Sequence, residues 1–330
     1  MKTNVVYNMD CLDKFKDIPD NSINLIVTDP PYNIGKAEWD KIDNYIEWCS
    51  EWISECERVL KYTGSFYFFH NEFDSLVKLY LLIKENTQFK FKQFISWDKW
   101  NNKIEKGNNL QGAFYKIVHN PGLKNYPKMS EYILFYTFQE GTGLDNIKKD
   151  VNNFTTLRNY FEGLQEYIGL SLSKINKTLG HRKAEHCFYW NSTQWDLPTK
   201  ETYQELIKEF NINKYKEYQT YNELEKEYQK LRESYESLRY TFKNTNNITS
   251  IWQHPIPNKK ERIKHPTQKP VELIENIIKH SSNKGDIVLD CFAGSGTTGV
   301  ACQNTNRDYI LIEQDEEYCN IINDRLKRGD

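Results

Sequence analysis

Two short segments, far apart in the chain, carry residue types that suit group-transfer chemistry. One is segment 28–33, Thr-Asp-Pro-Pro-Tyr-Asn, which follows the apolar run Ile23–Val27. Successive prolines remove two backbone donors and fix φ, so the segment is stiff and presents carbonyl acceptors. We expect a planar ring with an amino group to bind here, with its amino hydrogens on Asp29 and the Pro30 carbonyl and its face on Tyr32. A simple proline turn after a strand is the alternative.

The other is segment 290–298, Asp-Cys-Phe-Ala-Gly-Ser-Gly-Thr-Thr, which follows the predicted strand Ile287–Asp290 and opens a helix. Glu313 ends the next predicted strand, about twenty residues later. Glycines let a backbone approach a ligand closely, and a carboxylate on the second strand can accept both ribose hydroxyls. We therefore predict a nucleoside-cofactor site, although a Gly-x-Gly alone is often only a tight turn. We also expect both segments to line one cleft at neighbouring strand ends.

The elements that must position these segments alternate between strand and helix patterns. Apolar recurrences at three and four residues predict helices over 45–60 and 271–280, and short apolar runs predict strands between them. The predicted strands are 23–27, 65–69, 94–97, 132–138, 287–290 and 309–312. Strands separated by helices indicate a parallel α/β sheet. Because the pattern stops near residue 140 and returns after 257, the chain begins and ends in one α/β domain with an insertion between.

The insertion, residues 141–257, is polar, rich in tyrosine and poor in strand signals. Within it, a seam of apolar residues recurs by threes and fours: Tyr221, Leu224, Tyr228, Leu231, Tyr235, Leu238 and Phe242. This spacing is typical of a coiled-coil segment over 215–245 or of an ordinary amphipathic helix that lies on its own domain. We expect the insertion to be largely helical.

The charge distribution is uneven although the net charge is only −2. Nine lysines and three acidic residues lie between Lys84 and Lys128, and a second basic cluster spans Lys259–Lys269. Such stretches can attract phosphates locally, or can simply be solvated faces. The seven cysteines form no Cys-x-x-Cys pair, so we predict free thiols and no metal site. No export signal or bilayer-length apolar run is present, so we expect a cytoplasmic protein without membrane contact.

Taken together, the motifs resemble those of the DNA amino-methyltransferases, the N6-adenine and N4-cytosine family. Asp-Pro-Pro-Tyr comes first and Phe-x-Gly-Ser-Gly last, which resembles the permuted order of the β group. Two further segments match, His265-Pro-Thr-Gln-Lys-Pro270 and Asn8-Met-Asp-Cys-Leu12. One position departs from the family pattern, because Cys291 stands where the family usually has proline.

The resemblance implies a Rossmann-like, doubly wound, mostly parallel seven-stranded sheet with a largely helical insertion. Residues 1–140 would be the catalytic half, 141–257 a target-recognition region, and 258–330 the cofactor-binding half. The catalytic residues implied are Asp29, Pro30, Pro31 and Tyr32. The residues implied for S-adenosyl-L-methionine are Asp10, Cys11, Asp29, His265, Thr267, Gln268, Lys269, Asp290, Phe292, Gly294, Ser295, Gly296, Thr297, Thr298 and Glu313.

The implied activity is methylation of adenine N6 in double-stranded DNA, on a base flipped out of the helix. Aspartate at the head of the tetrad is typical of adenine enzymes, whereas serine is common among cytosine-N4 enzymes. A cytosine-N4 methyltransferase and a non-catalytic nucleic-acid-binding subunit on the same fold remain as alternatives. The resemblance also implies a prokaryotic or phage-encoded protein at the nucleoid, with a second copy of the chain and a cognate restriction endonuclease as candidate partners.

Overall fold

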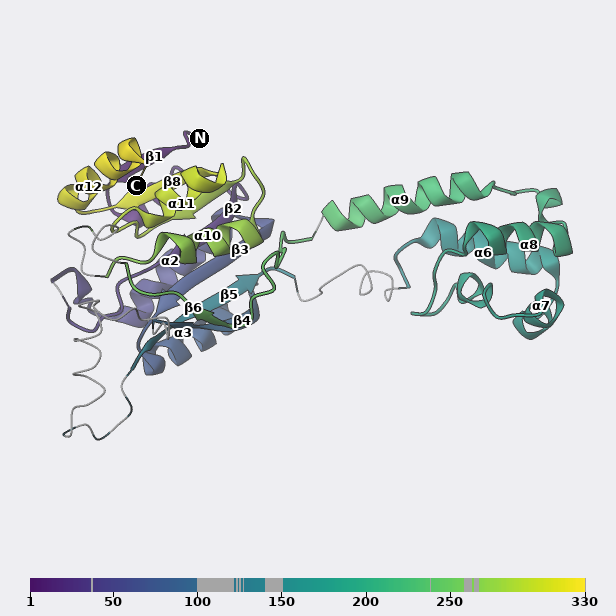
Figure 1. The fold of residues 1–330 in the computed structure, drawn as a ribbon, viewed down its shortest axis with the longest axis horizontal. Coiled ribbons are helices and arrows are strands. Elements are labelled where there is room, and N and C mark those ends of the chain that lie inside the picture. The colour runs from purple at the N-terminus through teal and green to yellow at the C-terminus, as the bar shows by residue number, and fades with distance from the viewer. Residues whose placement is uncertain are drawn as a thin grey trace, which may run out of the picture. The chain divides into compact units, whose positions relative to one another are not determined.

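The computed structural model describes residues 1–36, 38–99, 122, 124, 126, 128–139, 151–237, 239–257, 263 and 267–329. The chain forms two compact units (Figure 1). The sheet unit comprises Met1–Glu140 and Tyr240–Asp330, and the helical unit comprises Gly141–Arg239. The sheet unit is therefore assembled from two separate stretches of the chain.

A single eight-stranded sheet, in the order β1-β8-β7-β2-β3-β5-β4-β6, forms the centre of the sheet unit. Its strands are β1 (Val5–Asn8), β2 (Ile23–Thr28), β3 (Leu60–His70), β4 (Lys90–Asp98), β5 (Ser130–Thr137), β6 (Ile251–Gln253), β7 (Ile287–Asp290) and β8 (Asp308–Glu313). Every neighbouring pair is parallel except the two pairs that β5 makes. This arrangement confirms the predicted mostly parallel α/β class.

One strand more than the predicted seven is present, because the three-residue β6 adds to the edge of the sheet beside β4. Polar sequence around this strand hides it, since only its central Trp252 is buried and the flanking Ile251 and Gln253 are exposed. The Trp252 indole N–H donates to the Thr249 carbonyl at 2.7 Å, which satisfies its polar atom.

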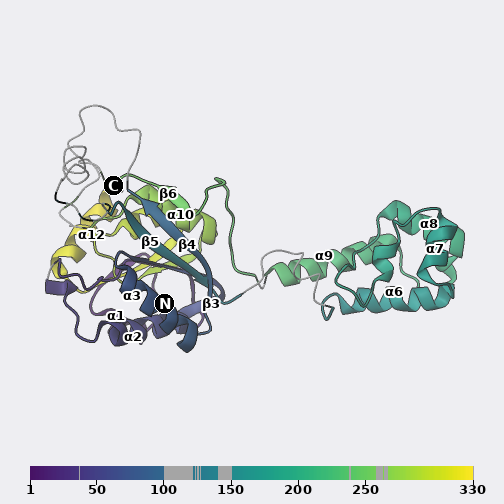
Figure 2. The same ribbon diagram turned by 90° about the horizontal axis from the view of Figure 1, so that it is seen from below.

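Helices cover both faces of the sheet (Figures 1 and 2). On one face lie α1 (Cys11–Phe15), α2 (Tyr45–Val59) and α3 (Phe73–Asn86), and on the other α10 (Val271–Ser281), α11 (Thr297–Thr305) and α12 (Glu316–Arg328). Along β2, Ile26 packs with the first set, and Leu25 and Val27 with the second. Because both faces are covered, β2 is buried at every position from Leu25 to Thr28 rather than at alternate ones.

Strand β7 lies directly beside β2 although nearly the whole chain separates them in sequence. The two are parallel, with Leu25 paired to Val288 and Ile26 to Leu289. Parallel neighbours place their carboxyl ends at the same edge of a sheet, which is where ligands bind in open α/β folds. Segments 28–33 and 290–298 thus emerge at one edge.

The helical unit has a core of its own. It contains α6 (Thr155–Ile168), α7 (Leu172–Leu179), α8 (Lys200–Phe210) and α9 (Tyr221–Ser237). Arg158 is buried there, and its guanidinium donates to the carbonyls of Asn153, Trp190 and Ser192. The unit ends at Arg239 rather than at the expected residue 257, because residues 248–256 pack their apolar side chains against the core of the sheet unit.

The predicted apolar seam over 215–245 is not one continuous helix. Helix α9 spans Tyr221–Ser237 and turns the seam residues Leu224 and Tyr228 into the core of the helical unit. Phe242, the last residue of the seam, instead stacks on Phe135 of the sheet unit, with ring centroids 5.6 Å apart. The segment is thus an amphipathic helix on its own unit, the second of the two readings, and Leu238 lies outside the described residues. None of the described helices has the length and apolarity required to span a membrane.

Candidate active site

A cavity of about 600 Å³ lies at the carboxyl ends of β2, β7 and β8. Its walls include residues of both predicted segments, which we call the proline loop (residues 28–36) and the glycine loop (residues 290–298). The hydroxyl of Thr28 donates to the Asp290 carboxylate at 2.9 Å and joins the two loops directly. The structure therefore brings together two segments that are 262 residues apart at this bond.

Asp290 organises the glycine loop from within. Its carboxylate accepts hydrogen bonds from the hydroxyls of Thr28 and Thr298, the latter at 2.6 Å, and from the backbone N–H of Phe292 at 3.2 Å. Burial raises the pKa of Asp290 to about 6, and these hydrogen bonds work against the rise. Because all its partners are neutral, Asp290 sets the shape of the loop without a cation.

Glu313 closes the loop from the neighbouring strand. Its carboxylate accepts the backbone N–H groups of Gly294 at 2.8 Å and of Asp315 at 2.9 Å, one on each oxygen. A carboxylate oxygen has two acceptor positions, so each oxygen can still accept a ligand hydroxyl. Burial raises the pKa of Glu313. Gly296 then begins α11 with φ +74°, and a Cβ there would lie 2.8 Å from the Ile322 side chain.

Most residues predicted for the cofactor line this cavity. They are Asp10, Cys11, Asp29, Thr267, Lys269, Asp290, Phe292, Gly294, Ser295, Thr297, Thr298 and Glu313. Gln268 and Gly296 do not line it, because Gln268 accepts the backbone N–H of Ile263 and Gly296 forms the turn behind the loop. His265 lies outside the described residues.

A buried aspartate that the sequence analysis missed fixes the proline loop. Asp40 is 1% exposed, and its carboxylate accepts four backbone N–H groups. The donors are those of Tyr32 at 2.9 Å, Asn33 at 2.7 Å, Ile34 at 3.1 Å and Lys36 at 3.0 Å. No motif marks Asp40 in the sequence; only its place a few residues after a predicted turn could have suggested this role.

The side chain of Tyr32 is less accessible than expected. Its ring is 6% exposed and packs on His70 with centroids 4.9 Å apart, and its hydroxyl donates to Asp29. Burial lowers the pKa of His70 to about 4, so the imidazole is neutral near pH 7. The Tyr45 hydroxyl, 3.0 Å from His70 Nε2, donates to the Pro31 carbonyl at 2.9 Å. Neutral hydrogen bonds thus support the back of the loop.

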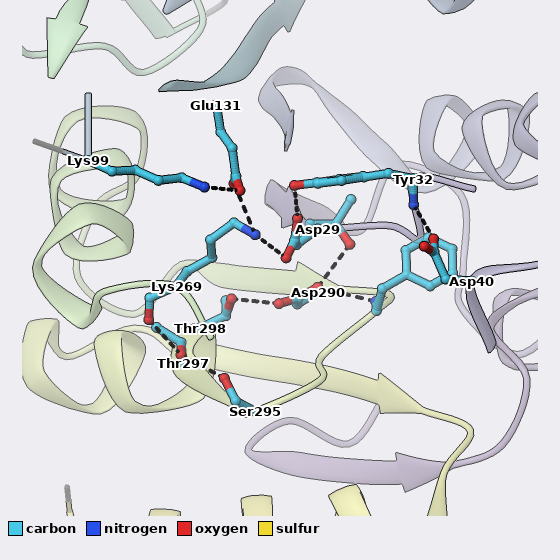
Figure 3. Close-up of polar contacts among 12 residues, drawn as sticks. Asp29, Tyr32, Asp40, Lys99, Glu131, Lys269, Asp290, Ser295, Thr297 and Thr298 are labelled. Atoms are coloured by element: carbon cyan, nitrogen blue, oxygen red, sulfur yellow. Dashed lines mark hydrogen bonds and ion pairs between the residues drawn. The ribbon is translucent and has the colours of Figure 1, made fainter. Parts of the chain in front are cut away.

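Three charged side chains meet on the other side of Asp29 (Figure 3). The Lys269 ammonium donates to Asp29 and lies 3.4 Å from Glu131 of β5, and Lys99, directly after β4, donates to Glu131. Neither Lys99 nor Glu131 was predicted, because neither belongs to a motif. Lys269 was expected at the cofactor but makes its ion pairs with Asp29 and Glu131.

The charges in this cluster stabilise one another. Burial opposes the charge on Lys269, but the Asp29 and Glu131 carboxylates outweigh it and raise the pKa of Lys269. Burial likewise opposes ionisation of Glu131, but Lys269 and Lys99 hold its pKa below the ordinary value. Lys269 and Glu131 are therefore both charged near pH 7, whereas burial raises the pKa of Asp29 above its ordinary value despite the ammonium beside it.

A family model described as DNA methylase, for N6 and N4 amino-methyltransferases, matches residues 23–324. The chain belongs to this DNA methylase family. Its substrate is DNA, and its methyl donor is S-adenosylmethionine.

Individual members of the family are similar over nearly the whole chain. Identity is 24% over 326 residues with the type II methyltransferase M1.MboII of Moraxella bovis, covering 98% of this chain and 96% of the relative. Identity is 28% over 318 residues with the DNA adenine methyltransferase YhdJ of Escherichia coli (strain K12), covering 94% of this chain and 78% of the relative. The structure of the cytosine-N4-specific PvuII DNA methyltransferase shares the fold with a TM-score of 0.51 at 14% identity, covering 100% of this chain and 94% of that one.

The residues at the glycine loop suit the methyl donor of a DNA methylase. Glu313 retains acceptor positions for ribose hydroxyls, and the Gly294 backbone borders the cavity. Phe292 presents an aromatic ring that packs on Trp48, with centroids 5.5 Å apart. A volume of about 600 Å³ lies within the range of small-molecule sites. Among the residues that the structure describes, no three His, Cys, Asp or Glu side chains gather as a metal site.

Proposed function

We propose that this DNA methylase is adenine-specific and methylates N6 of adenine within a defined DNA sequence. The observation that carries the proposal is the position of Asp29, whose carboxylate borders the cavity that the glycine loop also lines. A methyl donor bound by the glycine loop and an amine bound by Asp29 would share this single space.

The protein's part in the reaction is to activate and align a weak nucleophile. The adenine amine delocalises its lone pair into the ring, and acceptors on both its hydrogens favour a pyramidal nitrogen. In our proposal Asp29 and the Pro30 carbonyl are these acceptors, and they stabilise the positive charge that develops on nitrogen. The sulfonium of S-adenosylmethionine supplies the methyl group. Asp29 need not be a strong base, because the cationic product amine loses its proton readily.

A base paired in a duplex cannot reach this cavity, so we infer that the target base is flipped out of the helix. Tyr32 would then replace part of the lost stacking, which requires its ring to become more accessible than it is here. Lys84 and Lys90 are exposed on the sheet unit and suit contacts to phosphate. Most of the remaining basic stretch up to residue 128, and most of the cluster 259–269, lies outside the described residues.

Two features favour adenine over cytosine. The tetrad begins with Asp29 rather than serine, and the relative YhdJ is named a DNA adenine methyltransferase. The fold does not discriminate, since the PvuII enzyme of the same fold is cytosine-N4-specific. Cytosine N4 is therefore the competing outcome of the test.

We infer that the helical unit reads the target sequence, because the catalytic residues belong to the sheet unit. Its exposed Lys174, Lys177, Arg182 and Lys183 suit phosphate contacts. The type II relative M1.MboII supports a place in a restriction-modification system. We propose a cognate endonuclease and a second copy of the chain as partners.

The decisive experiment is expression in a host without DNA methylation, followed by modification-sensitive sequencing of its genome. N6-methyladenine at one recurrent sequence is the expected result. N4-methylcytosine would overturn the adenine assignment, and an unmodified genome despite binding of S-adenosylmethionine would favour a non-catalytic DNA-binding subunit.

A further inference from the structure

Both oxygens of Asp29, one of the two acceptors that the proposed reaction assigns to the substrate amine, already bind a donor of the protein itself. Asp29 Oδ1 accepts the Tyr32 hydroxyl, and Asp29 Oδ2 accepts the Lys269 ammonium. The same ammonium lies 5.6 Å from the centroid of the Tyr32 ring, on which the base would stack. An incoming amine therefore competes with these two donors for Asp29, and the Lys269 ammonium beside the Tyr32 ring is the charged one of the two.

A second acceptor for this ammonium is already in place. Glu131 is 4% exposed, and its Oε1 atom accepts Lys99. Its Oε2 atom has no hydrogen-bond partner among the described residues, yet it lies 3.4 Å from Lys269 Nζ. The long ion pair with Lys269 compensates this buried oxygen only weakly, so the atom gains from any movement of Lys269 toward it (Figure 3).

We propose that Lys269 is an internal placeholder for the substrate amine, and that Glu131 is the site to which its ammonium withdraws when the base enters. The inference rests on the proposed methylation of an amino group at Asp29. It makes Lys269 and Glu131 positioning residues: neither exchanges an atom with the substrate, but together they control access to Asp29.

Electrostatics give the withdrawal a second purpose. Transfer of the methyl group makes the amine cationic, and an ammonium left beside it would oppose that charge. Glu131 neutralises Lys269 at the moment when Asp29 turns to the substrate. Lys99 and Lys36 are the other cations that act on Glu131, and they keep it ionised throughout.

The backbone of Lys269 is well placed for such a movement. Its carbonyl accepts the Thr297 hydroxyl at 3.2 Å, which ties this residue to the start of α11 in the glycine loop. The main chain is thereby anchored, and only the flexible lysine side chain has to swing between two carboxylates.

The test is a suppression experiment with tritiated S-adenosylmethionine and genomic DNA from an unmethylated host. In Glu131→Gln the ammonium has only Asp29 as a charged partner, so it stays there and blocks the base. We expect the KM for DNA to rise by about tenfold or more, with affinity for S-adenosylmethionine unchanged within about twofold. Adding Lys269→Met should return the KM to within about threefold of the parent protein.

The matched control removes an ion pair of the same chemistry outside the site, Glu275→Gln and Lys279→Met on α10, in which Lys279 is exposed and Glu275 is half-buried; it should leave all constants unchanged. Additive damage in the Glu131–Lys269 double variant would overturn the inference, because a merely structural role allows no rescue. A tenfold loss of S-adenosylmethionine affinity in Lys269→Met would also overturn it and assign this lysine to the cofactor.

If Glu131→Gln alone does not fold, the comparison is made in the Lys269→Met background. There Glu131 has no ammonium to receive, so both proteins should share one KM for DNA; a higher KM in the double variant contradicts the inference. Failure of the parent protein to methylate any DNA would instead refute the proposed function, and the inference with it.

Discussion

The glycine loop and the proline loop border the same cavity, but their carboxylates are paired in different ways. At the glycine loop, Asp290 and Glu313 accept neutral donors, namely two threonine hydroxyls and backbone N–H groups. Asp29 of the proline loop is instead paired with a charged side chain that has a second carboxylate within 3.4 Å. The first arrangement is fixed before any ligand arrives, whereas the second has an alternative partner built in.

In the proposed function, this difference follows from what each loop binds. A cofactor site gains affinity when its groups are preorganised, since little has to be ordered on binding. A site for a transient nucleophile needs to be accessible only when the base is present. While the base is absent, a buried carboxylate without any partner would destabilise the folded protein. The comparison predicts that changes in the proline loop alter turnover, and that changes in the glycine loop alter stability and cofactor affinity.

The largest effect is expected for Asp29→Ala. Loss of the acceptor for the amine should lower kcat by on the order of 10²–10³-fold. Affinity for S-adenosylmethionine, measured by calorimetry, should remain within about threefold, because the glycine loop keeps its own hydrogen bonds. Retained turnover would show that the proline loop is not the catalytic site.

Asp40→Asn tests whether the shape of the proline loop matters. An amide presents its NH₂ group to two of the four backbone donors that Asp40 now accepts, so those contacts become repulsive. We expect kcat to fall by about tenfold through misplacement of Asp29, with cofactor affinity little changed. A fall in cofactor affinity as large as the fall in kcat would contradict the separation of the two loops.

Gly296→Ala tests the rigidity of the glycine loop, with Gly285→Ala as its control. Both glycines have positive φ, +74° and +81°, so each alanine carries the same backbone strain of about 1–2 kcal/mol. Only at Gly296 does the new Cβ meet another residue, the Ile322 side chain at 2.8 Å. In urea unfolding, Gly296→Ala should lower the free energy of unfolding by about 1–3 kcal/mol more than Gly285→Ala does. Equal losses for the two variants would show that the glycine loop can move to accommodate the new Cβ and is not rigid.

The smallest predicted effect is a pH dependence carried by Asp290. Its pKa is raised from 3.8 to about 6 by burial, so between these values the folded protein holds a proton that the unfolded chain has lost. Stability therefore falls as the pH rises through this window and is level above it. From pH 5 to pH 7 the parent protein should lose about 1.4 kcal/mol more than Asp290→Asn. Identical changes in urea unfolding would contradict this assignment.

Local sequence patterns predicted six of the eight described strands, all but β1 and β6, because a buried parallel strand must be apolar until it reaches the sheet edge. Segments 23–28 and 287–290 show this rule, and Glu313 follows from it as the last residue of β8. The neighbours of Asp29 could not be predicted in the same way. Glu131 and Lys99 reach the site from the antiparallel pair β4 and β5, and their partners depend on three-dimensional packing that no local pattern records.

The errors have the same physical origin. Periodicity in the segment 215–245 correctly indicated an apolar helix face, but it could not show which core would cover that face. Phe242 was therefore predicted to belong to the same helix, although the helix ends at Ser237 and Phe242 stacks on Phe135. Tyr32 was expected to present its ring face to a bound base, but His70 on β3 packs against that ring.

The insertion of β7 between β2 and β8 has a consequence for synthesis on the ribosome. Thr28 is translated 262 residues before its partner Asp290, an interval of roughly 13–50 s at ordinary elongation rates. Throughout that time the nascent β2 has an unpaired, strongly apolar edge, which invites association with other chains. In truncated chains that end before Ile287, this edge of β2 stays unpaired permanently. We expect such chains to aggregate or to remain bound to chaperones.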